Sequence, residues 1–161
     1  MSFPAPLPPT LAPLSLPPMP LQLRRRPDGQ AEIFDALRQR YVRLTPEEWV
    51  RQHFCHWLVS EMGYPAALTA NEVSLRTGGA VRRADTVVFR RDGGSPHVVA
   101  EYKAPSIALT QRVLDQIVSY NRTLCADYLF ISNGLAHYAF RIDSATGLPS
   151  LIPCVPRYEN L

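Results

Sequence analysis

Three short runs rich in apolar and β-branched residues, separated by glycine-rich turns, constrain the fold of this chain more than any other feature. The runs are EVSLR (72–76), RADTVVF (83–89) and HVVAEYK (97–103). A Gly-Gly pair at 78–79 separates the first two runs, and DGGSP (92–96) separates the last two. Because short runs of this kind bounded by turn residues are typical of strands joined by tight turns, we expect a three-stranded antiparallel meander.

Two amphipathic helices are predicted on either side of this meander in the sequence. The first lies within 44–64 and begins with Thr45 as N-cap, with Glu48 three residues later, which is the capping-box pattern. Its apolar residues recur at helical spacing, and Gly63 ends it. The second lies within 109–125 and carries its apolar residues on one arc. The residues predicted to face the core are Val50, Phe54, Trp57, Leu58, Val113, Leu114, Ile117, Val118 and Leu124.

Two hairpins complete the predicted elements. The runs DYLFIS (127–132) and HYAFRI (137–142) flank an Asn-Gly pair, which is the strongest short signal for a hairpin. At the other end, LQLRRRPDGQAEIFD (21–35) is typical of a short hairpin around Pro-Asp-Gly. The element order after this first hairpin is therefore helix, three-strand meander, helix, strand, strand.

Residues 1–22 differ sharply in composition from the rest of the chain. They hold eight of the 16 prolines and no basic residue. Because proline at this density excludes both helix and β-ladder, we expect a disordered or polyproline-like tail, with the folded domain in residues 23–161. The segment also lacks the basic start of a secretory signal peptide. A ligand for a proline-binding partner and a translation start at Met19 are the alternatives.

Composition narrows the classes of function. No run of about 18 apolar residues occurs, so we expect a cytoplasmic protein without a membrane partner. Three widely spaced cysteines without a CxxC pair argue against a disulfide framework or a cysteine zinc site. The four histidines lack an HExxH pattern, and no P-loop motif is present. A net charge of +3 permits an anionic partner without requiring one.

Two acidic residues and the only lysine of the chain come together on the predicted meander. If the turn between the second and third strands centres near Gly93, Asp85 and Glu101 lie opposite one another. Opposite residues of an antiparallel pair project from the same face with Cβ atoms about 5 Å apart. Lys103, two residues after Glu101, joins that face. Like charges on an apolar sheet are costly unless something neutralises them, so we expect a Mg²⁺ site here.

Lys103 stands out because the other 16 basic residues are arginines. A compact ammonium can orient or deprotonate an attacking water, whereas a guanidinium stays charged and presents a broad fork. We therefore interpret Lys103 as a catalytic residue. The alternative is a plain cross-strand salt bridge between Asp85 and Lys103, with Glu101 on the rim.

The spacing of these residues resembles the PD-(D/E)XK nuclease motif. Ala84-Asp85 matches its first part, with alanine where the motif has proline, and Glu101-Tyr102-Lys103 matches the second. The element order is also similar to the αβββαβ core of that superfamily. This resemblance implies an α/β, restriction-endonuclease-like fold, in which helices flank a mixed central sheet.

Further segments resemble one branch of that superfamily. Gln116 and Tyr120 match the QxxxY helix motif of RecB-like nucleases and type I restriction enzymes. The segments LTPEEWVRQHF, RADTVVF, EYKAPS, TQRVLDQIVSYN and ISNGLAHY together resemble the N-terminal nuclease domain of type I restriction enzyme R subunits. The resemblance covers roughly residues 23–158, and we expect a short stand-alone form without the ATP-driven motor.

This resemblance implies a Mg²⁺-dependent DNA endonuclease, with Mn²⁺ able to substitute. Asp85 and Glu101 would bind the cation, the Tyr102 carbonyl would be an additional ligand, and Lys103 would position or activate water. Partners would be DNA, subunits of a restriction or repair system, and a second copy in a homodimer. The alternative is a non-cleaving nucleic-acid-binding or assembly module. Supporting roles at the site or on the DNA backbone would fall to Glu48, Gln116, Tyr120, Arg82 and Arg83.

Overall fold

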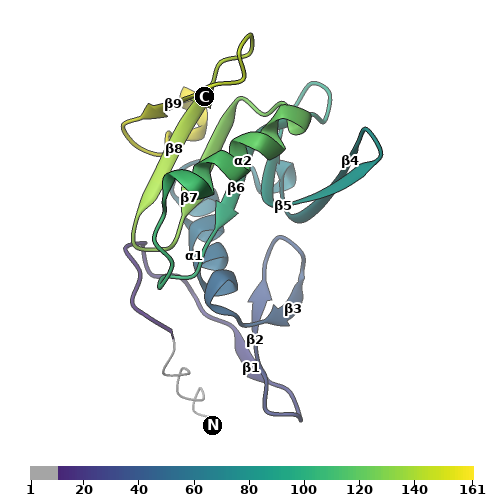
Figure 1. Ribbon diagram of the computed structural model, residues 1–161. Helices are drawn as coiled ribbons and strands as arrows, with labels where there is room; N and C mark the ends of the chain where they lie inside the picture. The colour runs from purple at the N-terminus through teal and green to yellow at the C-terminus, as the bar shows by residue number, and fades with distance from the viewer. Residues whose placement is uncertain (1–10) are drawn as a thin grey trace.

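The computed structural model describes residues 11–161, in which a large β-sheet lies between two α-helices and a small second sheet lies at one end (Figure 1). The helices are α1 (Pro46–Ser60) and α2 (Gln111–Leu124). Within the described residues, neither helix is long and apolar enough to cross a bilayer. The small sheet has the order β1-β2-β3, and the large sheet has the order β4-β5-β6-β7-β8-β9. The strands are β1 (Leu23–Arg25), β2 (Ala31–Asp35), β3 (Arg40–Arg43), β4 (Thr69–Thr77), β5 (Ala80–Phe89), β6 (Pro96–Tyr102), β7 (Tyr128–Ser132), β8 (His137–Ile142) and β9 (Pro149–Ile152), and two 3₁₀ turns are η1 (Ala66–Leu68) and η2 (Tyr158–Asn160).

The large sheet is mixed because α2 connects β6 to β7. Strands β4, β5 and β6 pair antiparallel, as the predicted meander requires. Strands β6 and β7 are parallel, and parallel neighbours need a crossover connection, which α2 supplies. The remaining pairs, β7 with β8 and β8 with β9, are antiparallel. The predicted element order and the α/β class, with helices flanking a mixed sheet, are therefore confirmed.

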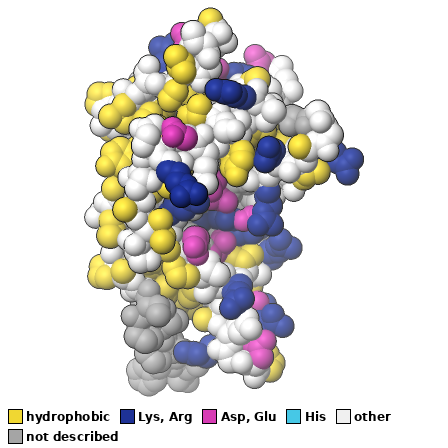
Figure 2. All heavy atoms as spheres, viewed as in Figure 1, with side chains coloured by type: hydrophobic (Ala, Val, Ile, Leu, Met, Phe, Trp, Pro, Cys, Tyr) yellow, Lys and Arg dark blue, Asp and Glu magenta, His cyan; other side chains and the backbone are white. Residues whose placement is uncertain are grey.

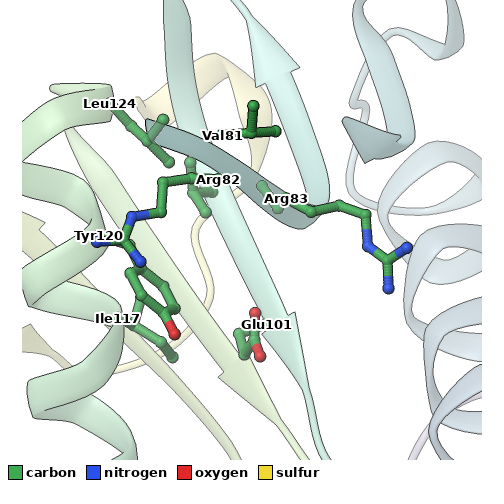
Figure 3. A pocket seen from close by; sticks show the side chains of 9 residues that line it. Val81, Arg82, Arg83, Glu101, Ile117, Tyr120 and Leu124 are labelled. Carbon is green, nitrogen blue, oxygen red and sulfur yellow. The ribbon is translucent and has the colours of Figure 1, made fainter. Parts of the chain in front are cut away.

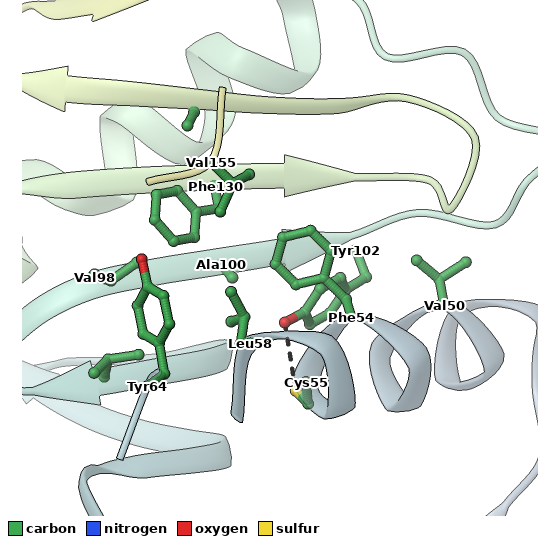
Figure 4. Packing of buried hydrophobic residues seen from close by; sticks show 12 residues of the cluster. Val50, Phe54, Cys55, Leu58, Tyr64, Val98, Ala100, Tyr102, Phe130 and Val155 are labelled. Atoms are coloured by element: carbon green, nitrogen blue, oxygen red, sulfur yellow. Dashed lines mark hydrogen bonds between the residues drawn. The ribbon is translucent and has the colours of Figure 1, made fainter. Parts of the chain in front are cut away.

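Each face of the large sheet packs against one helix. On β6, Val98 and Ala100 belong to the core on the α1 side, whereas Val99 belongs to the core on the α2 side, because successive strand residues alternate between faces. The rings of Phe54 and Tyr102 meet edge to face, 5.5 Å apart, in the α1-side core (Figure 4). Burying one large apolar side chain stabilises the fold by about 1.5–3 kcal/mol, so packing on the sheet holds both helices in place.

Residues 11–20, predicted to belong to a disordered or polyproline-like tail, lie against the folded body. The backbone N–H of Ser15 donates to the carbonyl of Gly134 at 2.7 Å. The indole N–H of Trp49 donates to the carbonyl of Ala12 at 3.1 Å. These bonds attach the segment both to the loop after β7 and to α1.

The packing of this segment was not part of the expectation of a disordered or polyproline-like tail, and it has a physical reason. Proline prevents helix and β-ladder, but it does not prevent apolar side chains between the prolines from packing. Leu14 and Leu16 pack against the core on the α1 side. Residues 1–10, the rest of the predicted tail, lie outside the described residues.

Both predicted terminal hairpins are present, and each sheet has one strand more than predicted. Strands β1 and β2 form the N-terminal hairpin, and the unpredicted β3 adds to it. The Asn-Gly hairpin joins β7 to β8 through residues 133–136, with Gly134 in the left-handed region at φ +83°. The unpredicted β9 extends the large sheet. Both extra strands have only four residues, the lower limit of a recognisable strand run, and β9 begins with a proline.

Candidate active site

The two acidic residues of the predicted site lie where β5 and β6 cease to pair. The last pair in register is Thr86 with Ala100, and continuing the register by one residue places Asp85 opposite Glu101. The side chain of Asp85 turns toward the backbone of β6, where its Oδ2 accepts a 2.9 Å hydrogen bond from the N–H of Tyr102. This bond holds the carboxylate of Asp85 between the two strands.

Lys103 follows the last residue of β6 and lies next to Glu101. Its backbone N–H donates to the carbonyl of Ser132 at 2.9 Å, which keeps this segment beside the end of β7. Its Nζ lies 3.5 Å from Oε1 of Glu101. The ion pair that forms is therefore with Glu101, rather than the bridge to Asp85 that a purely structural role would predict. The end of β6 thus brings the two carboxylates and the only lysine together.

Burial makes it difficult for the two carboxylates to ionise together. The pKa of Glu101 is raised to about 7, first by burial and then by Asp85, while Lys103 partly opposes the shift. The pKa of Asp85 is also raised, again first by burial, with Glu72 adding to the shift and Arg51 opposing it. More positive charge at this point would favour the ionised form of both groups.

Sequence reasoning missed one charged residue at the site, Arg51 on α1. Its side chain is almost fully buried, with 5% of the residue exposed. Its Nη2 lies 2.5 Å from Glu72 and 3.5 Å from Asp85, and its Nη1 lies 3.6 Å from Glu48. Within residues 11–161, Nε and Nη1 have no hydrogen-bond partner. In the sequence Arg51 is one of 16 arginines, and no motif distinguishes it.

Glu72 on β4 was missed for a similar reason. It adopts φ +56°, a backbone conformation that is uncommon for residues other than glycine. Its neighbours Asn71 and Val73 both pair with β5, so the irregularity is confined to this one residue. Its carboxylate accepts from Arg51 at 2.5 Å and from Arg83 at 2.7 Å. A backbone irregularity of this kind leaves no signal in the sequence.

Glu48 belongs to the same charge network, and only half of the predicted capping box forms. The Oγ1 of Thr45 accepts from the backbone N–H of Glu48 at 3.1 Å, as predicted. The carboxylate of Glu48 does not return to the cap, because it accepts from Arg38 at 2.7 Å instead. Arg51 contacts both Glu48 and Asp85, so Glu48 is connected to the site through that guanidinium.

Arg82 and Arg83 point away from β5 in opposite directions (Figure 3). Arg82 extends toward α2, where its guanidinium carbon lies 5.1 Å from the centre of the Tyr120 ring. Arg83 extends toward α1 and pairs with Glu72. Adjacent strand residues alternate between faces, so these two arginines serve different sides of the site rather than one surface.

Of the two motif residues on α2, Tyr120 lies at the site and Gln116 does not. A pocket of about 220 Å³ between α2 and strands β5 and β6 is lined by Tyr120, Arg82, Arg83 and Glu101 together with apolar residues (Figure 3). Gln116 is exposed and does not line this pocket.

Comparison with known proteins identifies the family to which this chain belongs. A family model described as type I restriction enzyme R protein N terminus matches residues 46–156, which is more than half of the chain. The chain belongs to this family. The predicted resemblance to the N-terminal region of R subunits is thereby confirmed, whereas membership of the PD-(D/E)XK superfamily stays a prediction.

Among solved structures, this R-protein N-terminal domain aligns with a fragment assigned to the HsdR subunit of a type I restriction enzyme from Vibrio vulnificus YJ016. The alignment has a TM-score of 0.49 and 22% sequence identity, and it covers 70% of this chain and 24% of that chain. The domain therefore spans about a quarter of that chain's length. No curated protein matches it.

The oxygen donors of this R-protein N-terminal domain fit a hard divalent cation. Residues 11–161 contain no cluster of three or more His, Cys, Asp or Glu side chains placed to hold a metal ion. Mg²⁺, however, is usually held by one or two protein carboxylates, with water and substrate phosphate completing its shell. Asp85 and Glu101 supply two carboxylates with raised pKa values, which a nearby cation would lower.

A chain of buried hydrogen bonds connects the strands that carry the site. The hydroxyl of Tyr102 donates to Thr86 at 3.0 Å, that of Thr86 donates to Asn71 at 2.6 Å, and the amide of Asn71 donates to Asp35 at 3.0 Å. The Tyr102 hydroxyl also lies 3.6 Å from the sulfur of Cys55 (Figure 4). These bonds link β6, β5, β4 and β2 in turn, and thus tie the small sheet to the strands that carry the site.

Proposed function

We propose that this chain is a Mg²⁺-dependent DNA endonuclease that hydrolyses phosphodiester bonds, with Asp85, Glu101 and Lys103 as its catalytic residues. One observation carries the proposal, namely the meeting of these three side chains where β5 and β6 separate. Asp85 is held there by the N–H of Tyr102, and the Nζ of Lys103 lies 3.5 Å from Glu101. Membership of the R-protein N-terminal family supports a restriction-related role.

Each of these residues has a distinct task in the proposed reaction. Asp85 and Glu101 would hold Mg²⁺, or Mn²⁺ in its place, and the backbone carbonyl of Tyr102 would add a third oxygen. The bound cation supplies polarisation of the scissile phosphate and a lower pKa for water. The ammonium of Lys103 would donate hydrogen bonds that orient the attacking water and offset negative charge on the phosphate.

Other predicted residues would support the site from its two sides. Tyr120 and Arg82 line the pocket that contains Glu101, so they would contact the DNA strand on the α2 side. On the α1 side, Arg83 would hold the backbone and Glu48 would act through Arg51. Gln116 is exposed and would act only on DNA that extends along α2.

The decisive experiment is cleavage of supercoiled plasmid and single-stranded DNA by the purified chain, with Mg²⁺, with Mn²⁺ and with chelator. We expect metal-dependent cleavage by the wild type, and its loss in Glu101→Gln and Lys103→Ala. Glu159→Gln serves as the control because this exposed glutamate lies in the 3₁₀ turn at the C-terminus. Cleavage that survives both site substitutions would overturn the proposed catalytic residues.

A second candidate, a nucleic-acid-binding or assembly module that does not cleave, has one observation in its favour. The guanidinium of Arg51 already places a positive charge beside Asp85 and Glu72, so the acidic residues are partly neutralised by the protein itself. Such a module would bind DNA equally well with chelator and with Mg²⁺, and would leave plasmid intact. DNA binding without cleavage under every metal condition would therefore favour this candidate.

A further inference from the structure

A second surface feature lies next to the site, on its α1 side. An open groove of about 520 Å³ runs between the small sheet and strands β4 and β5, with the first turn of α1 at its base. Figure 2 shows basic side chains gathered along this side of the molecule, next to the acidic side chains at the centre of the view. The groove is lined by Arg38, Arg40, Arg43 and Arg83, together with the hydroxyl residues Thr45 and Ser74.

The charge of this groove is mostly positive and partly uncompensated. Its two acidic residues, Glu48 and Glu72, are each paired with arginines. Arg40 and Arg43, in contrast, are exposed on β3 and make no ion pair with any residue in 11–161. Their guanidinium groups are therefore available to an anionic partner.

The groove is connected to the proposed catalytic residues through the charge network of Glu72 and Arg51. Glu72 forms part of its wall and shares the Nη2 of Arg51 with Asp85, at 2.5 Å and 3.5 Å respectively. An extended anion in the groove would thus approach the site from the side opposite to the pocket of Tyr120. A strand of DNA, which carries regularly spaced phosphates, matches a groove in which arginines and hydroxyl groups are spread along the walls.

We propose that this groove binds the sugar–phosphate backbone of DNA, with Arg40 and Arg43 of β3 as phosphate-binding residues. The inference rests on the proposed function for the identity of the partner, and it extends the DNA-binding surface from β5 to the small sheet. Phosphate contacts of this kind are independent of base sequence and sensitive to salt. The small sheet is therefore a part of the substrate-binding surface, in addition to its packing role.

The test measures the binding of DNA to the chain under conditions in which metal-dependent cleavage does not occur. A fluorescein-labelled DNA duplex is titrated with the chain in the presence of chelator, and anisotropy is recorded at several salt concentrations. The test variant is Arg40→Gln/Arg43→Gln. The matched control is Arg91→Gln/Arg141→Gln, which removes the same charge from exposed positions in the β5–β6 turn and on β8, neither of which lines the groove.

We expect the test variant to bind the DNA duplex at least about tenfold more weakly than the wild type at moderate salt, because two phosphate contacts are lost. Each phosphate contact contributes about 0.9 to the slope of log K against log salt. The slope of log K against log salt should fall by about 1.8 for two lost contacts. The control should keep the affinity and slope of the wild type to within about twofold. Circular dichroism verifies that both variants are folded.

Two results would overturn the inference, and only one of them would also count against the proposed function. Equal weakening by the test variant and its control would reject the groove while leaving DNA as the partner of the proposed enzyme. A wild-type chain that does not bind DNA at low salt would reject the groove and also remove the substrate from the proposed function.

Discussion

The backbone N–H of Tyr102 donates a 2.9 Å hydrogen bond to the carboxylate of Asp85, across the point where β5 and β6 separate. The side chain of the same tyrosine packs in the core on the α1 side, where it is 2% exposed and its hydroxyl donates to Thr86. One residue therefore links the proposed catalytic carboxylate to the buried polar chain beneath it. The geometry of the site depends on that chain as well as on the strands.

Thr86→Val tests the contribution of the buried hydrogen-bond chain. The change keeps the shape of the side chain but leaves the hydroxyl of Tyr102 and the amide oxygen of Asn71 without this partner. We expect the free energy of unfolding, measured with urea, to fall by about 2 kcal/mol, because unsatisfied buried polar groups cost about 1–3 kcal/mol. Thr123→Val, at an exposed position on α2, is the control and should change it by less than about 0.5 kcal/mol. Equal losses in the two variants would contradict the role of the chain.

Arg51→Met tests whether the guanidinium balances the acidic residues. Methionine keeps much of the side-chain volume but leaves Glu72 and Asp85 without this cation. We expect a loss of about 3 kcal/mol in the free energy of unfolding, because breaking a buried ion pair leaves an uncompensated charge.

The same variant tests the metal site by a measurement other than activity. MgCl₂ should raise the melting temperature of Arg51→Met by more than it raises that of the wild type, because the cation would replace the lost positive charge. NaCl at matched ionic strength controls for general screening. An identical response of both proteins to MgCl₂ would argue against cation binding at Asp85.

Asp35 should make stability depend on acidic pH. Burial alone would raise its pKa, but hydrogen bonds from Asn71 and from the backbone and side chain of Arg38 outweigh burial and lower it below the ordinary value of 3.8. A lowered pKa in the folded state means that the ionised form stabilises the fold above the unfolded pKa. This stabilisation is lost as the pH falls through the folded pKa.

We therefore expect Asp35→Asn to be less stable than the wild type at neutral pH by about 2 kcal/mol, the usual contribution of hydrogen bonds to a charged group. The difference should shrink as the pH falls below about 4, where the wild type also loses the charge. Urea unfolding from neutral to acidic pH measures it. A difference that stays constant over this range would mean that ionisation of Asp35 does not matter.

Gly134→Ala tests whether residues 11–20 pack on the body. Gly134 has φ +83°, and an added Cβ would lie 2.6 Å from a methyl carbon of Leu14. Gly147→Ala is the matched control, since it has φ +70° but no atom within 4 Å of the added Cβ. Both variants should lose about 1 kcal/mol from backbone strain, and Gly134→Ala should lose about 1–3 kcal/mol more from the overpacking. Most of this excess should disappear when Leu14→Ala is combined with it, and a smaller part should remain because the added Cβ also lies 3.1 Å from Val50. An excess that persists in full in the double variant would place its cause elsewhere.

The predicted parts of the site are those whose positions follow from local patterns. A turn centred near Gly93 predicts that Asp85 lies opposite Glu101, and the observed register agrees, although a β-bulge between Val88 and Phe89 shifts the pairing by one residue beside the turn. Arg51 and Glu72 could not be predicted in the same way. Arg51 reaches the site only because α1 packs on the sheet, and Glu72 turns toward it only because of one irregular backbone angle.

The sequence by itself determined the order of the elements, the α/β class and the candidate catalytic triplet, because strand period, helix period and turn chemistry act over a few residues. Only the tertiary structure decided which charges meet. It brought Arg51 between Glu48, Glu72 and Asp85, sent Arg82 and Arg83 to opposite sides, and placed the groove of Arg40 and Arg43 beside the site. Apart from the pair of Arg51 with Glu48 on α1, these contacts join segments that are distant in the chain. The energy of a charge also depends on burial and on partners that a linear sequence does not specify.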